Sequence, residues 1–114
     1  MIPSRRTRVV GRARDFIEES LSGAVRLEDI ARASGVGARS LQLAFRERFQ
    51  LSPMEYLRAR RLSEVHRALR TAAPGSLTVS DVATSHGCFH LGRFSHYYRD
   101  LFGELPSETL SARR

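Results

Sequence analysis

The chain has 114 residues, enough for one domain or for two very small ones that share a connecting element. Its formal net charge is +7, and all 19 basic residues are arginine, whose planar fork of donors suits phosphate and the guanine edge. The single cysteine, Cys88, excludes an intrachain disulfide, and no apolar run approaches the ~18 residues of a transmembrane helix.

Apolar residues recur at helical spacing along almost the whole chain, and no segment alternates with a period of two. The sequence therefore predicts an all-α protein of seven helices, preceded by a basic, loosely ordered lead-in at residues 1–8. In chain order, the helices are expected at residues 9–21, 27–34, 38–49, 53–71, 79–86, 90–102 and from 106 onward, where the last one frays into residues 111–114.

The fourth of these helices has the clearest start signal. Ser52 can cap it, Pro53 suits the first helical position, and Glu55 completes a capping box. The run AAPGS at residues 72–76 ends it, because proline and glycine break helices.

Two halves of the chain can be aligned with each other. The segment DIARASG at residues 29–35 matches DVATSHG at residues 81–87 with an offset of 52, which becomes 53 after one inserted residue. The apolar residues then coincide in four pairs: Leu41 with Phe94, Phe45 with Tyr98, Phe49 with Phe102, and Pro53 with Pro106. Each half is predicted to form a short helix, a turn with glycine (Gly35 or Gly87) and a longer helix with arginines, which is the helix-turn-helix layout. We therefore expect a first subdomain at residues 9–52, a linker helix at 53–72 and a second subdomain at 73–114.

Two stretches also resemble a known family. They are LEDIARASGVGARSLQLAFRERFQLSPMEYLRARRL and DVATSHGCFHLGRFSHYYRDLFGELPSETL, and the part from HLGRF onward is the most specific. They are similar to the C-terminal DNA-binding domain of AraC/XylS-type transcription regulators, over about residues 9 to 112. The resemblance implies two homeodomain-like helix-turn-helix subdomains on a long linker helix, sequence-specific binding to double-stranded promoter DNA, and transcriptional activation through RNA polymerase.

The sequence departs from the family pattern in two places. Gln50 stands where the first unit usually has glycine, so a less favoured residue must make that turn. Cys88 stands where an aromatic or large apolar residue is common, and looser packing is expected there.

Full-length members mostly carry a further effector-binding or dimerisation domain on the N-terminal side, for which this chain has no room. The isolated chain is therefore expected to be monomeric, whereas its parent protein can dimerise. The first ten residues lack the apolar stretch of a secretory signal, so a bacterial cytoplasmic, nucleoid-associated location is expected.

The N-terminal parts of the third and sixth helices are the expected DNA-reading surfaces, because a recognition helix enters the major groove by that end. Arg39 can bond a guanine edge bidentately and Gln42 can pair with adenine, whereas Leu43 offers a thymine methyl only apolar contact. The expected base contacts in the first unit are Arg39, Ser40, Gln42 and Leu43, and those in the second are Gly92, Arg93, Ser95 and His96, beside Leu91. The expected phosphate contacts are Arg46, Arg60, Arg61 and Arg99.

Three other classes of function agree less well with the sequence. A metal or thiol sensor would use Cys88 with nearby histidines, but the H-x-C-x-H spacing has no second cluster to complete a tetrahedral site. A protein-interaction fragment with weak DNA binding stays open because Leu43 weakens polar readout. An enzyme is not expected, since HExxH, P-loop, G-x-S-x-G and dinucleotide motifs are all lacking, and neither is a cofactor or a metal.

Overall fold

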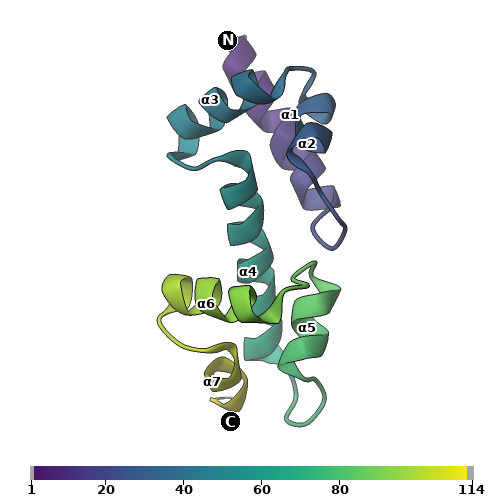
Figure 1. Ribbon diagram of the computed structural model, residues 1–114, viewed down its shortest axis with the longest axis vertical. Helices are drawn as coiled ribbons and strands as arrows, with labels where there is room; N and C mark the ends of the chain where they lie inside the picture. The colour runs from purple at the N-terminus through teal and green to yellow at the C-terminus, as the bar shows by residue number, and fades with distance from the viewer. Residues whose placement is uncertain (1, 113–114) are drawn as a thin grey trace. The chain divides into compact units, whose positions relative to one another are not determined.

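The computed structural model describes residues 2–112, and in that part of the chain all regular structure is α-helical (Figure 1). The helices are α1 (Arg5–Glu19), α2 (Leu27–Ser34), α3 (Ala38–Phe49), α4 (Pro53–Thr71), α5 (Val79–Ser85), α6 (Leu91–Phe102) and α7 (Pro106–Ser111). The all-α prediction of seven helices is therefore confirmed for the described residues.

The first helix differs from its prediction at both ends. The expected lead-in at residues 1–8 is wrong from Arg5 onward, because the Ser4 hydroxyl accepts the Thr7 N–H at 3.1 Å and starts α1 there. The helix ends at Glu19, so Leu21 lies in the following turn and still packs against the core. At the other end of the chain, part of the fraying expected at residues 111–114 lies outside the described residues, which end at 112.

The chain divides between Arg58 and Ala59, inside α4, into two compact units, each with its own apolar core. The first core is built from Val9, Val10, Ala13, Ile17, Ile30, Ala31, Leu41, Ala44, Phe45 and Leu57. The second is built from Leu62, Val65, Leu69, Val82, Ala83, Phe94 and Tyr98. Residues 53–72, expected as a separate linker, thus contribute side chains to both cores.

The repeat extends further than the sequence analysis recognised, because α1 and the second half of α4 occupy equivalent places. With the same offset of 52, Val10 corresponds to Leu62, Ala13 to Val65 and Ile17 to Leu69. All six side chains are buried. Each unit therefore consists of a supporting helix followed by the two helices of a helix-turn-helix.

The predicted capping box at the start of α4 is present. The Ser52 N–H donates to Glu55 Oε1 at 2.7 Å, and the Glu55 N–H donates to the Ser52 hydroxyl at 3.1 Å. The first of these bonds holds the pKa of Glu55 below its usual value. In the second unit Leu105 replaces the serine, and only the bond from its N–H to Glu108, at 2.7 Å, is retained.

The recognition helices of the two units end differently. α6 ends on Gly103 in the left-handed region (φ 74°), where a side chain would be strained. At the matching position α3 ends on Gln50 (φ 59°), the one non-glycine residue with positive φ in the described chain. The expected unfavourable turn is therefore confirmed.

A polar network is enclosed within the second unit. The Tyr98 hydroxyl donates to Thr109 Oγ1 at 2.7 Å and lies 2.8 Å from His66 Nδ1. Burial and the nearby Arg70 lower the pKa of His66, against a smaller opposing effect of Glu104. The neutral imidazole is therefore the form that this core favours.

Candidate nucleic-acid interface

The turn between the two helices of each helix-turn-helix is a Schellman motif, in which a left-handed glycine lets two later N–H groups bond back to the helix. In the first unit Gly35 has φ 76°, and the Val36 N–H donates to the Ala31 carbonyl at 3.3 Å. In the second unit Gly87 has φ 81°, and the Cys88 N–H donates to the Ala83 carbonyl at 2.9 Å. The two turns thus present their recognition helices by the same local geometry.

The expected base-reading residues of α3 are all exposed. Arg39, Ser40, Gln42 and Leu43 reach solvent, and Leu43 is 57% exposed although it is apolar. Neither Arg39 nor Gln42 has a side-chain hydrogen bond or ion pair within residues 2–112, so their donors are available to a ligand. Leu41 and Phe45, on the opposite side of the helix, anchor α3 in the core.

The expected base-reading residues of α6 are less uniform. Gly92, Arg93 and His96 are exposed, whereas Ser95 is half-buried. A Cβ atom added at Gly92 would meet nothing within 4 Å, so the bare backbone there faces open space. His96 Nε2 lies 3.4 Å from Asp100 Oδ2, an ion pair when the imidazole is protonated.

The four arginines expected at phosphates have different surroundings. Arg99 is exposed and has no side-chain partner among the described residues. Arg46 donates to the Gln50 carbonyl at 3.1 Å and lies 3.7 Å from Glu55, so part of its fork stabilises the end of α3.

The other two, Arg60 and Arg61, are tied to the second unit. Arg60 pairs with Glu64 at 3.2 Å, and Arg61 is half-buried next to Cys88. The structure thus gives these two side chains interactions of their own, which the sequence analysis did not anticipate.

Comparison with known proteins identifies this pair of units. A family profile described as a helix-turn-helix domain matches residues 30–112. The chain belongs to the AraC-type helix-turn-helix family. It is thus a DNA-binding domain of a transcription regulator, as the resemblance implied.

Individual AraC-type relatives agree with this assignment. The XylDLEGF operon transcriptional activator 2 of Pseudomonas putida is 40% identical over 96 residues, which cover 84% of this chain and 61% of that protein. The probable thc operon regulatory protein of Rhodococcus erythropolis is 34% identical over 102 residues, covering 90% of this chain but 31% of that protein. The chain therefore spans 61% of the length of the first relative and 31% of the length of the second.

Solved structures show the same fold. A probable AraC-family transcriptional regulator from Rhodopseudomonas palustris superposes with a TM-score of 0.84 at 34% identity, covering 93% of this chain and 97% of that one. The DNA-binding domain of the global transcriptional factor AdpA, solved with a target DNA, superposes with a TM-score of 0.79 at 20% identity, covering 92% and 91%.

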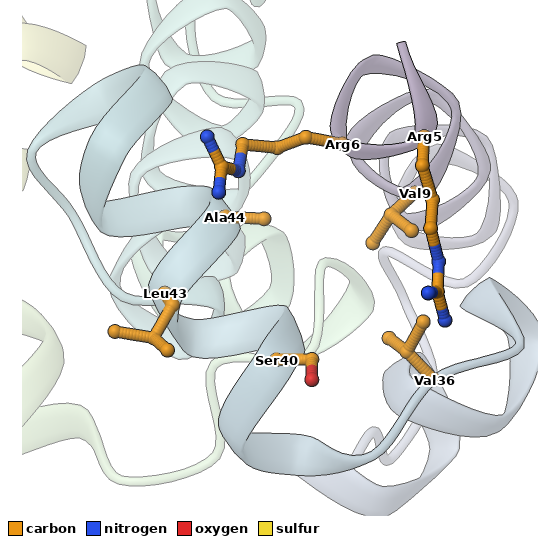
Figure 2. A pocket seen from close by; sticks show the side chains of 7 residues that line it. All are labelled: Arg5, Arg6, Val9, Val36, Ser40, Leu43 and Ala44. Carbon is orange, nitrogen blue, oxygen red and sulfur yellow. The ribbon is translucent and has the colours of Figure 1, made fainter.

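Two arginines at the start of α1 were not among the expected site residues. Arg5 and Arg6 line a hollow of about 260 Å³ between α1 and α3, together with Val9, Val36, Ser40, Leu43 and Ala44 (Figure 2). Two of these lining residues, Ser40 and Leu43, are expected base contacts. A signal was present in the sequence, because Ser4 is a good N-cap and Arg5 precedes the apolar Val9 by one helical turn.

A second feature outside the expected site is Phe89, which lies between Cys88 and the start of α6 and is 59% exposed although it is apolar.

The neighbouring Cys88 does not have the character of a sensor. It packs beside the second core at the position that Val36 takes beside the first, and burial raises the pKa of its thiol. A thiol held in its neutral form is a poor nucleophile and a poor metal ligand. Residues 2–112 contain no group of three or more histidine, cysteine or acidic residues placed to hold a metal, and no helix long and apolar enough to span a bilayer.

Proposed function

We propose that this chain reads an asymmetric promoter site in two parts, with the N-terminal halves of α3 and α6 in successive major grooves. The observation that carries the proposal is the repeated Schellman turn, which presents two recognition helices whose exposed residues differ. Grooves on one face of DNA recur about every 34 Å, so a monomer would cover roughly two helical turns.

In the first unit, polar readout is assigned to α3. Arg39 bonds the O6 and N7 of a guanine, and Gln42 bonds an adenine. Both side chains are exposed and have no partner of their own in the described chain. Ser40 and Leu43 complete this surface, Leu43 by contact with a thymine methyl group.

In the second unit, we assign the base contacts to Gly92, Arg93, Ser95 and His96. Gly92 lets the backbone approach the base edges, because open space lies over it. His96 is the main polar reader, and its pairing with Asp100 holds the imidazole on the exposed face. The half-buried Ser95 has the smallest share of its surface available for such a contact.

Among the phosphate contacts, Arg99 is the strongest assignment because its guanidinium is exposed and unpaired in the described residues. Arg46 can add a phosphate contact through the donors that Gln50 and Glu55 do not use. Arg60 and Arg61 rank below these two, since each is half-buried and engaged within its own unit.

For the whole regulator, we propose activation of transcription through contact with RNA polymerase, in the cytoplasm and without catalytic activity of its own. The names of the Pseudomonas putida relatives, which are operon transcriptional activators, support this assignment.

Selection from random duplex DNA at physiological salt, with the 114-residue chain alone, tests the proposal. We expect enrichment of an asymmetric two-part motif with its halves about one helical turn apart. Enrichment of one half alone would mean that one unit reads and the other only positions. If no motif is enriched and binding disappears as salt rises, the chain has no sequence preference of its own.

A further inference from the structure

The hollow beside α3 has the chemistry of an anion site. Arg5 and Arg6 leave the first turn of α1 on different sides of it, and Figure 2 shows Arg5 running toward Val36 and Arg6 reaching across to α3 near Ala44. Its remaining walls carry one hydroxyl, that of Ser40, and apolar side chains. Among the described residues no acidic side chain lines the hollow, and Glu47, which pairs with Arg6, offsets the charge of that arginine alone.

We propose that a backbone phosphate of the bound DNA occupies this hollow and is held by Arg5, so that α1 clamps the strand beside the groove that α3 enters. The Ser40 hydroxyl donates a second bond from the facing wall. This inference rests on the proposed function, because it requires α3 to lie in the major groove.

The partners of the neighbouring arginines single out Arg5. Arg6 is paired with Glu47, and Arg8 donates to the Pro3 carbonyl at 2.7 Å. The Arg5 side chain is exposed and has no hydrogen bond or ion pair within residues 2–112. A guanidinium with all its donors available can bind a phosphate through two parallel bonds.

The hollow also borders the DNA-reading face of α3. An α-helix turns about 100° per residue, so Leu43 lies between Arg39 on one side and Ser40 on the other. Ser40 and Leu43 line the hollow, whereas Arg39 and Gln42 lie beyond Leu43, away from it. A strand that borders the groove read by Arg39 therefore passes the mouth of the hollow.

Binding of the selected duplex, and of a random duplex of the same length, tests the proposal in wild type and Arg5→Ala. We expect Arg5→Ala to weaken binding about ten-fold on both duplexes, the usual value of one charge-assisted bond. The slope of log affinity against log salt should fall by about 1, because one fewer counterion is released. Arg5→Lys keeps the charge and should recover most of the salt slope.

Arg14→Ala is the matched control, since it removes the same charge from the same helix. Arg14 lies nine residues from Arg5, half a turn round α1, with its guanidinium 6.0 Å from the Phe49 ring centroid. Thermal unfolding of both variants checks that each remains folded.

Single methylphosphonate substitutions along the selected duplex locate the contact. One neutralised phosphate at the first half-site should weaken wild-type binding clearly and binding by Arg5→Ala much less, since only the Ser40 bond is left to lose there. Equal losses in both proteins, or equal effects of Arg5→Ala and Arg14→Ala, would overturn the clamp while leaving the proposed function intact. A wild-type chain that binds no duplex would overturn both.

Discussion

The two recognition helices offer a reciprocal test of backbone strain, because equivalent end positions hold Gln50 in one unit and Gly103 in the other. Both residues are left-handed, with φ 59° and 74°. A side chain in this region costs about 1–2 kcal/mol, which Gln50→Gly would release. The greater freedom of glycine in the unfolded chain offsets about 0.4–1 kcal/mol of that gain.

Gln50→Gly also removes the surface hydrogen bond that Gln50 Nε2 donates to the Glu47 carbonyl at 3.2 Å. We therefore expect Gln50→Gly to stabilise the first unit by about 0.5 kcal/mol, or about 2–4 °C in Tm. Gly103→Ala should destabilise the second unit by about 1 kcal/mol, although open space surrounds the new Cβ.

Hydrogen exchange read by mass spectrometry is the suitable assay, because it reports each unit separately. The chain contains no tryptophan, and its tyrosines lie in both units, so intrinsic fluorescence would mix the two signals. Exchange should slow in α1 to α3 for Gln50→Gly and quicken in α5 to α7 for Gly103→Ala.

Gln50→Ala is the control, because it removes the amide and keeps the strained Cβ. It should bring no gain in stability. If Gln50→Ala stabilises the first unit as much as Gln50→Gly does, or if Gly103→Ala is neutral, the reasoning from backbone strain is refuted.

Three further outcomes are expected. Arg39→Ala and His96→Ala should each weaken binding to the selected duplex about ten-fold or more and barely affect binding to a random duplex, measured by fluorescence anisotropy. Equal losses on both duplexes would contradict base readout. Cys88→Val should be neutral or slightly stabilising in chemical denaturation, because Val36 fills the equivalent turn, and DNA binding should resist mild oxidation. Stability should fall as pH drops below about 6.5, since the unfolded chain protonates His66 more readily than the folded one, and His66→Gln should flatten this dependence.

Local signals explain why much of the fold could be predicted from the sequence. α3 begins and ends at the predicted residues, and α4 begins at Pro53 with its predicted box. Caps, prolines and apolar spacing act within a few residues, so the sequence displays them directly. α1 was predicted four residues short because its first turn, from Arg5, is entirely polar and offers no apolar periodicity.

The environment of the predicted site residues depended on contacts that the sequence does not display. Arg6 meets Glu47 across 41 residues of chain, and the hollow beside α3 exists only because α1 packs there. The pairing of Arg46 with Glu55 and the partial burial of Ser95 likewise follow from tertiary packing. Exposure of a helical face could be predicted, whereas the partners of each arginine could not.

The two units have kept their interiors and changed their exteriors. Phe45 and Tyr98 fill the same place in the two cores, and both are fully buried. Arg39 and Gly92 occupy the same position on the two reading faces, but one carries a charged side chain and the other has no side chain at all. Packing constrains the first pair, since a core side chain must fit its neighbours closely, but solvent tolerates either residue of the second pair. A duplicated fold with divergent reading faces favours an asymmetric operator, because two unlike surfaces cannot both fit the halves of a palindrome.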